Sequence, residues 1–405
     1  MENKNKKADG LREFSPAAPG VILKPGREKS VQSHHHWIFS GTIQSYPKKF
    51  VNGDIYPVYS FNGRLLGYGY FNQNCSLCGR LISFSQVEPM EAIRLSLLEA
   101  VKLRQTIYKQ ADAVRLVNGE SDNLPGLIID RYGPGLVLQV STLGMEKLKP
   151  YLVNLISEIL KPEFIYEKSL IPSRKEEGLP EFEGLLAGKL REPVLVEEKG
   201  LSFKVYLTDS QKTGLFLDQR EMRALVRGLS ADRKVLDGFC YTGGFALSAL
   251  KGGAETVLLV DDSRKALDLA RENLLLNGFS EDSFRLVNED MFNFLKRVKH
   301  LDYDLVILDP PAFAKKKADE KQAVKAYREL NSLALAKMKP GTFLLTFSCS
   351  YHIDSNLFQK IIFQAALEAG REARIIQRHR LALDHPVSIF HPESDYLKGL
   401  LLYLN

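Results

Sequence analysis

The sequence predicts an α/β protein whose C-terminal part is a doubly wound, Rossmann-like sheet, preceded by a small β domain. One observation is the stretch VLDGFCYTGGF, residues 235–245, where an apolar run, a loop of small residues and a helix-compatible run follow one another. Glycines in such a loop let the backbone approach a ligand, and the helix N-terminus offers free amide groups. Another is that later apolar runs, ending in acidic residues, alternate with helix-compatible segments.

Four acidic residues stand at the ends of predicted strands: Asp237, Asp261, Asp290 and Asp309. Asp261 follows Asp237 by 24 residues (261 − 237), at the place where an acid binds ribose hydroxyls in doubly wound sheets. The loop lacks the G-x-G-x-x-G pattern, which disfavours a dinucleotide. One such acid alone would more often cap a helix. Four in order, the last followed by two prolines, resemble the series of the S-adenosylmethionine (SAM) methyltransferases.

Longer motifs narrow the resemblance to one family. They are DGFCYTGGFALSA, VDDSRKALDLARENLLLNG, DPPAF, LLTFSCS and DSQKTGLFLDQR, with KPGREKSVQSHHHWIFSGTI and DHPVSIFHPESDYLKGLLLYL near the two ends. Together they resemble the large-subunit ribosomal RNA cytosine-5 methyltransferases that carry an N-terminal PUA domain, over residues 20–405. The resemblance implies a class I SAM methyltransferase domain, a PUA β-barrel and a small α+β middle domain. Gly238 departs from the family pattern, which suggests a larger apolar residue there, so we expect a looser loop.

The chain divides into four parts. Residues 1–18, polar and rich in lysine, are expected to form a disordered tail. Residues 19–88 show short strands and an Asn62-Gly63 hairpin turn, which suit a small β-barrel. The resemblance implies that this part is the PUA-like, RNA-binding domain. Residues 89–190 form the α+β middle domain, with a charged loop at 168–183. The resemblance implies that residues 191–405 form the methyltransferase domain, with about seven strands. The sequence also predicts a terminal strand pair there, 388–391 and 399–404.

Composition sets further limits on function. The net charge of +6 and the pI near 8.9 favour polyanionic partners only mildly. No apolar run is long enough for a membrane span and the N-terminus has no signal core, so we expect a cytoplasmic protein without a membrane partner. Cys75 and Cys78 form a C-x-x-C with no second pair to complete a zinc site, so no metal is predicted. The oligomeric state stays open, a homodimer included.

Cys349 and Asp309 are the predicted catalytic residues. Carbon 5 of cytosine is a poor nucleophile until a thiolate adds to carbon 6, and this chemistry needs a cysteine beside the methyl donor. Cys349 follows the apolar run 342–347, at the ligand-binding edge of the predicted sheet, and Asp309 ends the neighbouring strand. A lone cysteine is more often a small buried hydrophobe, but the surrounding motifs favour the nucleophile. Cys240, inside the cofactor loop, receives no catalytic role.

The resemblance also implies a SAM site. Residues of the segment 209–220 should close over the cofactor as a lid, Asp237 and Asp261 should support it through the loop backbone and the ribose, and Asp290 should meet the adenine amino group. The predicted cofactor-binding residues are Gln211, Thr213, Phe216, Asp218, Asp237, Phe239, Tyr241, Gly243, Asp261, Asp290 and Asp309.

The predicted RNA contacts lie in two basic segments. Arg27 and Lys29 stand beside the basic and aromatic run 34–37, which can hold phosphates and stack a base, although we expect Trp37 to be part of the core. Lys315, Lys316 and Lys317 follow the Asp-Pro-Pro loop directly. A charge run is usually a solvated face, but its place beside the expected catalytic mouth favours phosphate contact.

Two other functions remain open. The Asp-Pro-Pro loop with Phe313 resembles the motif of amino-group methyltransferases, in which the aromatic residue directly follows the second proline; here Ala312 does. The second alternative is a catalytically idle RNA-binding or ribosome-assembly factor. The series of four acidic residues and Cys349 argue against it. The leading hypothesis is a SAM-dependent RNA cytosine-5 methyltransferase whose partner is large-subunit ribosomal RNA or its assembly intermediate.

Overall fold

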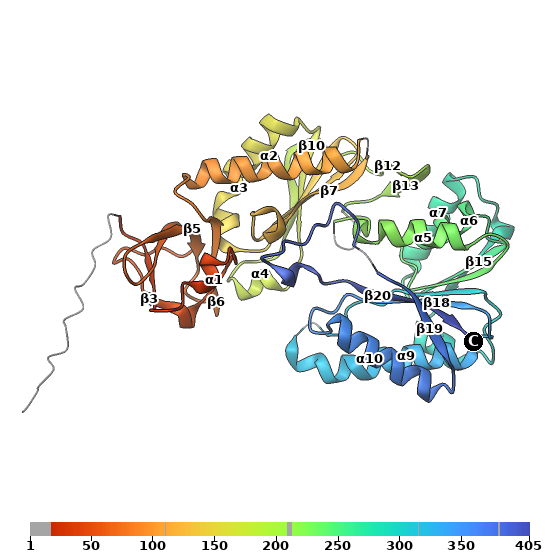
Figure 1. The fold of residues 1–405 in the computed structure, drawn as a ribbon. Coiled ribbons are helices and arrows are strands. Elements are labelled where there is room, and N and C mark those ends of the chain that lie inside the picture. The colour runs from red at the N-terminus through yellow and green to blue at the C-terminus, as the bar shows by residue number, and fades with distance from the viewer. Residues whose placement is uncertain (1–17, 110, 209–212, 315, 380) are drawn as a thin grey trace, which may run out of the picture.

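The computed structural model describes residues 18–405 except 110, 209–212, 315 and 380. Nearly all of the predicted tail therefore lies outside the described residues. Three sheets and one hairpin follow one another along the chain, with a small β domain at one end and the largest sheet at the other (Figure 1). No described helix combines the length and apolar character that a membrane span requires.

The N-terminal β domain is a six-stranded sheet in the order β2-β6-β5-β4-β1-β3. The predicted hairpin is confirmed, because β4 and β5 pair antiparallel and Gly63 sits in their turn at φ +83°. The prediction that Trp37 is core is wrong: its ring is half-buried, and its indole N–H donates to Glu120 Oε1 of the middle domain at 2.9 Å. The elements are β1 (Val21–Leu23), α1 (Lys29–Gln32), β2 (Trp37–Phe39), η1 (Ser40–Thr42), β3 (Ile43–Ser45), β4 (Ile55–Tyr59), β5 (Leu65–Phe71) and β6 (Leu77–Ser83).

The middle domain is a five-stranded sheet in the order β11-β10-β9-β8-β7, with α2 and α3 packed together on one face (Figure 1). Pro89 opens α2 and the Glu88 side chain accepts the amides of Met90 and Glu91, which satisfies the first turn. The elements are α2 (Pro89–Ile107), β7 (Ala113–Asn118), η2 (Gly119–Asp122), β8 (Leu127–Tyr132), β9 (Gly135–Val140), α3 (Leu143–Leu160), β10 (Phe164–Ser169), α4 (Ser173–Glu176) and β11 (Phe182–Gly188).

Residues 168–183, expected to form a charged loop, contain regular structure and buried charged side chains at Lys168, Arg174 and Glu177, while most of the other residues are exposed. The segment contains α4, and it ends in an edge strand, β11, that pairs with β10. Arg174 is 1% exposed and pairs with Glu146 at 2.9 Å, because a buried guanidinium needs a carboxylate partner. The charge of this segment therefore serves packing as well as solvation.

The C-terminal domain is a seven-stranded sheet in the order β16-β15-β14-β17-β18-β20-β19, which confirms the predicted doubly wound fold. All neighbours are parallel except β20, which pairs antiparallel with β18 and β19. The helices α5, α6 and α7 cover one face, and α8, α9 and α10 cover the other (Figure 1). The strand order reverses between β14 and β17, the place where such sheets bind ligands.

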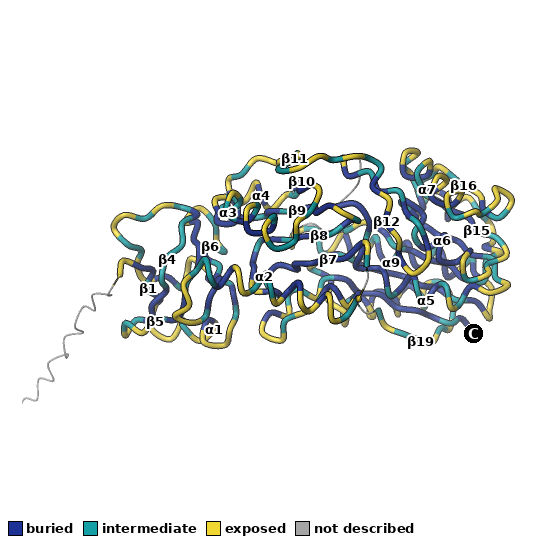
Figure 2. The backbone as a smooth tube through the Cα atoms, turned by 90° about the horizontal axis from the view of Figure 1, so that it is seen from above, coloured by how far each residue is buried: buried dark blue, intermediate teal, exposed yellow. Residues whose placement is uncertain are grey.

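The hairpin β12–β13 and this sheet comprise the remaining elements. They are β12 (Val194–Glu198), β13 (Leu201–Val205), η3 (Leu217–Gln219), α5 (Arg220–Leu229), β14 (Lys234–Gly238), α6 (Gly244–Lys251), β15 (Thr256–Asp261), α7 (Arg264–Leu276), η4 (Glu281–Ser283), β16 (Phe284–Asn288), α8 (Met291–Arg297), β17 (Leu305–Leu308), η5 (Lys317–Asp319), α9 (Glu320–Lys337), β18 (Phe343–Ser348), α10 (Ser355–Glu368), β19 (Ala373–Arg378), η6 (Pro392–Ser394) and β20 (Lys398–Leu404). The inner strands β14, β17 and β18 are buried along most of their length. Figure 2 shows that exposed backbone lies mainly at the periphery of the molecule.

The predicted terminal strand pair is half wrong. Residues 399–404 do form most of β20, but Ser388 and His391 make only an isolated bridge. The antiparallel partners of β20 are β18 and β19, and sequence analysis did not identify β19, residues 373–378. Its apolar residues Ile375 and Ile376 are exposed, so the segment lacks the clean alternation of a half-buried strand.

Candidate active site

A cavity of about 490 Å³ opens at the carboxyl ends of β14, β15, β17 and β18. Sequence-distant segments meet there: the lid segment, the glycine loop, the ends of the central strands and the Asp-Pro-Pro loop. The lining residues are Phe203, Leu215, Phe216, Asp218, Gln219, Arg223, Phe239, Cys240, Tyr241, Thr242, Gly244, Phe245, Asp261, Asp262, Asp290, Phe292, Asp309, Pro310, Pro311, Ala312, Phe313, Cys349 and Leu397.

Asp261 organises the glycine loop from the end of β15. Its carboxylate accepts the backbone amides of Tyr241 and Ser263, both at 2.9 Å. Burial raises the pKa of Asp261, and these two amide hydrogen bonds oppose that rise. Phe239 and Tyr241 adopt positive φ values of +60° and +47°, which are costly for non-glycine residues and are typical of ligand-binding turns.

Asp237 lies behind the loop and does not line the cavity. Its Oδ2 accepts the Ala246 amide at 3.0 Å, while its buried Oδ1 has no hydrogen-bond partner among the described residues. Burial raises the pKa of Asp237 well above the ordinary aspartate value. Gly243 caps α6 at φ +78°, a left-handed conformation that favours glycine.

The expectation that Gly238 loosens the loop is wrong. The residue ends β14 in a tightly packed position, and a Cβ there would lie 2.9 Å from Met291 Sδ and 3.1 Å from the Ile307 carbonyl oxygen. A larger side chain would need these neighbours to move. The small residue is therefore matched to its surroundings.

In the described part of the lid segment, residues 213–220, four residues line the cavity: Leu215, Phe216, Asp218 and Gln219. The rings of Phe216 and Tyr241 meet edge to face, with centroids 5.2 Å apart. Asp218 is 4% exposed and accepts the Tyr396 hydroxyl at 2.5 Å, which ties the lid to the C-terminal segment. Gln219 donates its side-chain amide to Asp309 at 2.9 Å.

Thr213, another predicted lid residue, does not line this cavity. Thr213 donates to Asp130 Oδ2 at 2.6 Å and lines a second cavity, of about 640 Å³, between the middle sheet and the segment that holds Tyr396. Gln211 lies outside the described residues. Their predicted contact with a cofactor stays a prediction.

The predicted nucleophile and the Asp-Pro-Pro loop lie together. Cys349 follows β18 directly, is partly exposed, and places its Sγ 3.8 Å from the Pro310 carbonyl oxygen. Cys240 lines the same cavity but is 6% exposed. Burial, and secondarily the nearby Asp237 and Asp261, raise the pKa of the Cys240 thiol well above its ordinary value. A thiolate is therefore disfavoured at Cys240.

Asp290 caps α8 and still borders the cavity. Its Oδ1 accepts the Asn293 amide at 3.0 Å, and the residue is half-buried. Two aromatic rings stand beside it, Phe292 and Phe313, with centroids 6.0 Å apart. Sequence analysis had assigned neither ring to the cofactor cavity.

Lys398 is a further residue that sequence analysis missed. It pairs with Ser348 across the β18–β20 ladder, and its ammonium donates to the carbonyl oxygens of Ser350 at 2.7 Å and Tyr396 at 2.6 Å. Burial lowers the pKa of Lys398 to about 8, and attraction to Cys349, Asp395 and Asp354 opposes that shift. No local signal could identify it, because a lysine at the start of an apolar strand usually faces solvent.

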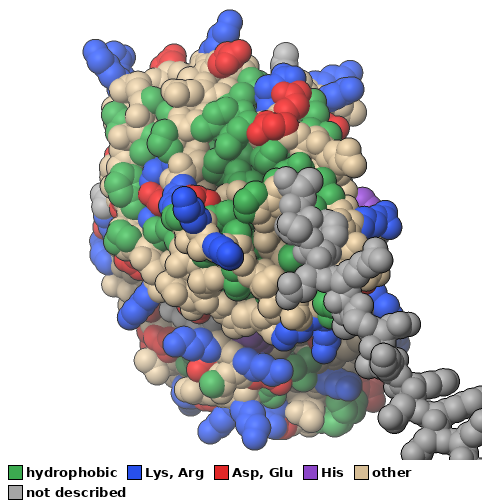
Figure 3. All heavy atoms as spheres, turned by 90° about the vertical axis from the view of Figure 1, so that its left-hand side faces the viewer, with side chains coloured by type: hydrophobic (Ala, Val, Ile, Leu, Met, Phe, Trp, Pro, Cys, Tyr) green, Lys and Arg blue, Asp and Glu red, His purple; other side chains and the backbone are tan. Residues whose placement is uncertain are grey.

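The predicted RNA contacts lie on the surface. Arg27 is exposed just before α1, and Lys29 is exposed as the first residue of that helix. Lys316 and Lys317 are exposed at η5. Lys315 lies outside the described residues. Lys and Arg side chains gather along the lower part of the face in Figure 3, where fewer acidic side chains are visible. Exposure permits contact with phosphates, which remains a prediction for all five residues.

Known proteins match almost the whole chain. Residues 181–371 match the family model described as S-adenosylmethionine-dependent methyltransferase, and residues 21–84 match a PUA-like domain. "Ribosomal RNA large subunit methyltransferase I" of Shewanella amazonensis is 40% identical over 388 residues, covering 94% of this chain and 98% of that one. The protein of the same name from Salmonella arizonae is 38% identical, covering 95% and 97%. A solved methyltransferase structure, SMU.776 complexed with S-adenosylhomocysteine (SAH), has a TM-score of 0.82, 25% identity, and coverage of 94% and 99%.

Proposed function

Since the chain belongs to the ribosomal RNA large subunit methyltransferase I family, we propose that it methylates carbon 5 of a cytosine in large-subunit ribosomal RNA, with Cys349 as the nucleophile. Family membership carries SAM-dependent methylation of this RNA. The target atom and the attacking residue are our proposal. The observation that carries them is that Cys349 and Asp309 line one cavity beside the glycine loop.

The cavity fits the chemistry of SAM, a molecule with a cationic sulfonium, an amino group and a ribose diol. Acidic residues and aromatic rings border it, among them Phe239 and Phe292; the five acidic residues are Asp218, Asp261, Asp262, Asp290 and Asp309. Carboxylates accept hydrogen bonds from ribose hydroxyls and amino groups, and aromatic faces attract cations. We assign the ribose to Asp261 and the adenine amino group to Asp290. When bound, SAM supplies an electrophilic methyl group.

Cys349 makes the cytosine ring reactive. Its thiolate adds to carbon 6, forming a carbon–sulfur bond and leaving carbon 5 enamine-like. Carbon 5 then takes the methyl group, and SAH departs. A base removes the carbon-5 proton, the electron pair re-forms the ring double bond, and the thiolate leaves carbon 6. Nucleophilic catalysis of this kind replaces one difficult step by several easier ones.

Asp309 serves the substrate from the neighbouring strand end. Its carboxyl group can hydrogen-bond the amino group and ring nitrogen of cytosine, which stabilises charge on the ring as the thiolate adds. Gln219 fixes that carboxylate through the 2.9 Å hydrogen bond. Pro310 and Pro311 stiffen the loop and provide no backbone N–H group that would compete.

We further propose that the PUA-like domain and the basic segment after the Asp-Pro-Pro loop hold the RNA backbone. Arg27, Lys29, Lys316 and Lys317 are the described candidates, and Lys315 is the fifth. The same proposal includes the domain boundaries at residues 88 and 190. In it, residues 19–88 bind the RNA and residues 191–405 carry out the methyl transfer.

The deciding experiment traps the covalent intermediate. The target cytosine of the RNA carries fluorine in place of hydrogen at carbon 5. A base cannot remove fluorine as it removes a proton, so the reaction stalls after methyl transfer with the protein still attached. The expected result is a SAM-dependent adduct that survives denaturing electrophoresis and maps by peptide mass to Cys349. Cys349→Ala should lose the adduct and methylation but retain SAM binding by calorimetry.

Cys240→Ala is the matched control, because this thiol borders the same cavity yet has no proposed step. It should still form the adduct. Normal methylation by Cys349→Ala would refute the cysteine mechanism and favour amino-group methylation at the Asp309 loop, where Phe313 lines the cavity. Absence of methylation from the unaltered protein, with RNA binding intact, would favour the idle assembly factor. Bisulfite mapping of ribosomal RNA from cells with and without the protein would locate the target.

A further inference from the structure

The run His34-His35-His36 sends its side chains in different directions. His36 is 2% exposed, and its Nδ1 hydrogen-bonds the Leu81 carbonyl oxygen at 2.8 Å, within the β domain. His35 faces the C-terminal segment instead. Its Nε2 lies 3.3 Å from both carboxylate oxygens of Glu393, a residue 358 positions later in the chain.

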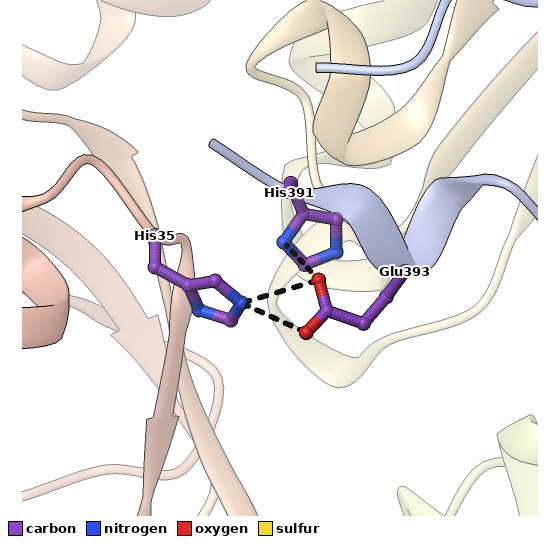
Figure 4. A group of neighbouring side chains, drawn as sticks. All are labelled: His35, His391 and Glu393. Carbon is purple, nitrogen blue, oxygen red and sulfur yellow. Dashed lines mark hydrogen bonds and ion pairs between the residues drawn. The ribbon is translucent and has the colours of Figure 1, made fainter. Parts of the chain in front are cut away.

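A third side chain completes the cluster. His391 is 1% exposed, and its Nδ1 lies 3.6 Å from Glu393 Oε2, too far for a hydrogen bond. That nitrogen has no hydrogen-bond partner among the described residues. Buried polar atoms without partners are rare and call for an explanation such as an ion. Figure 4 shows His35, His391 and Glu393 pointing toward one another from two separate parts of the chain.

We propose that His35, His391 and Glu393 bind a divalent transition-metal ion, Zn²⁺ in the first instance, and that this ion cross-links the N-terminal β domain to the C-terminal segment. Two histidines and a glutamate are an established zinc donor set, with a fourth position left for water. Zinc–nitrogen and zinc–oxygen bonds of about 2.0–2.1 Å place neighbouring tetrahedral ligands roughly 3.3–3.4 Å apart. The separations here are 3.3 and 3.6 Å, and all three ligand atoms lie within 4.8 Å of one another.

Coordination through Nε2 of His35 changes the contacts of its other ring nitrogen. His35 Nδ1 accepts the Trp37 amide at a long 3.3 Å. When His35 binds a metal through Nε2, its proton lies on Nδ1. The weak hydrogen bond from the Trp37 amide is then lost, and the metal bond replaces it.

The position of the ion gives it a structural consequence. Glu393 lies in η6, and the chain continues directly to Tyr396, which donates to Asp218 of the lid, and to Lys398 beside Cys349. An ion held by His35 would therefore fix the segment that runs from the β domain to the active-site cavity. This inference concerns the joint between domains and does not depend on which base is methylated.

Titration of the full-length, chelator-treated protein with Zn²⁺ tests the proposal. Calorimetry and elemental analysis should give one Zn²⁺ per chain. His391→Ala and Glu393→Gln should each weaken binding by about 100-fold or more, because loss of a direct ligand exceeds the roughly 10–100-fold effect of an outer partner. Hydrogen exchange of residues 388–396 should slow on addition of Zn²⁺ in the unaltered protein and not in these variants.

His34→Ala is the control from the same run. The ring of His34 packs at a tilt against Phe84 and Phe390, with centroids 5.0 and 5.2 Å away, and supplies no proposed ligand. This variant should bind Zn²⁺ as the unaltered protein does. Co²⁺ should give the visible absorption of a tetrahedral nitrogen and oxygen site without a thiolate charge-transfer band, which excludes Cys75 and Cys78. Sub-stoichiometric binding, unchanged affinity in His391→Ala and Glu393→Gln, or a thiolate band would overturn the proposal.

Discussion

Gln219 donates its side-chain amide to Asp309 Oδ2 at 2.9 Å, joining the lid segment to the Asp-Pro-Pro loop. Gln219 is 2% exposed and Asp309 is partly exposed at the cavity, so this hydrogen bond is partly buried. The contact therefore couples closure of the lid over the cofactor to the position of Asp309, the residue that we assign to the cytosine ring. A lid that moves away from the loop would release the Asp309 carboxylate from its proposed orientation.

We therefore expect Gln219→Leu to slow methylation more than it weakens SAM binding. A hydrogen bond to a charged group contributes about 1.5–3 kcal/mol, or roughly a 10- to 150-fold loss of rate. Single-turnover methylation and calorimetry with SAH would separate the two effects. Equal losses in both measurements would show that Gln219 serves the cofactor and not the orientation of Asp309.

Asp261→Ala should weaken SAM binding by about 1.5–3 kcal/mol, the range for hydrogen bonds that involve a charged group. The carboxylate accepts two loop amides and is our assigned ribose ligand, so its loss affects both the loop and the cofactor. Calorimetry measures the change. Asp268→Ala is the control, since Asp268 is exposed and pairs with Arg264 on the surface of α7 at 3.0 Å. Unchanged affinity in Asp261→Ala would remove Asp261 from the site.

The large sheet and its acidic strand ends could be predicted because both are local patterns. Each parallel strand is a short apolar run, and the carboxyl ends of parallel strands meet at one edge of a sheet. Asp261, Asp290, Asp309 and Cys349 border one cavity for that reason. The capping of α7 by Ser263 was equally predictable, since the residue precedes the helix and accepts its Ala266 amide.

The missed features depend on partners far away in the chain. Trp37 has a large apolar side chain of the kind expected in a core, but its indole N–H donates to Glu120, 83 positions later. The Tyr396 hydroxyl donates to Asp218, which lies 178 positions away in the chain. Hydrophobic periodicity cannot predict a contact between residues so far apart. Thr213 matches the lid motif but hydrogen-bonds Asp130 of the middle domain. Tertiary packing determines the contacts of these side chains, whereas a sequence pattern describes only residues that are close in the chain.

RNA affinity should fall steeply with salt, and alanine at Arg27, Lys29, Lys316 or Lys317 should reduce the slope. Each lost phosphate contact lowers the magnitude of the slope of log K against log salt by about 0.7–0.9. Filter binding over a salt series measures it. Lys102→Ala, an exposed lysine on α2, is the control. An unaltered slope in all four variants would place the RNA elsewhere.

Point variants serve this purpose better than deletion of residues 1–88. Arg80 of the β domain pairs with Glu177 at 2.6 Å, and Asn72 donates to the same carboxylate at 2.9 Å. Deletion would leave the buried Glu177 without these partners, which destabilises the middle domain. A loss of RNA binding after deletion would then have two causes.

Lys398 should give the methylation rate an alkaline limit. Its pKa is lowered to about 8 by burial, so the ammonium is present below pH 8 and is lost as the pH rises through that value. A cation at this position favours the Cys349 thiolate, because attraction between the two opposes the fall in the Lys398 pKa. The rate should rise with pH as Cys349 ionises and level off or decline once Lys398 is neutral.

Lys398→Met, which retains the volume of the buried side chain, should remove the alkaline limit and lower the rate at pH 7. A shift of one unit in the thiol pKa corresponds to about a 10-fold effect where the thiol is mostly protonated. Single-turnover rates across the pH range, with saturating SAM, measure both features. Lys337→Met is the control, since Lys337 donates to the Val298 carbonyl oxygen, on a helix outside the cavity. If Lys398→Met keeps the unaltered pH profile, the charge of Lys398 has no part in thiol activation, and its two hydrogen bonds to the backbone account for its burial.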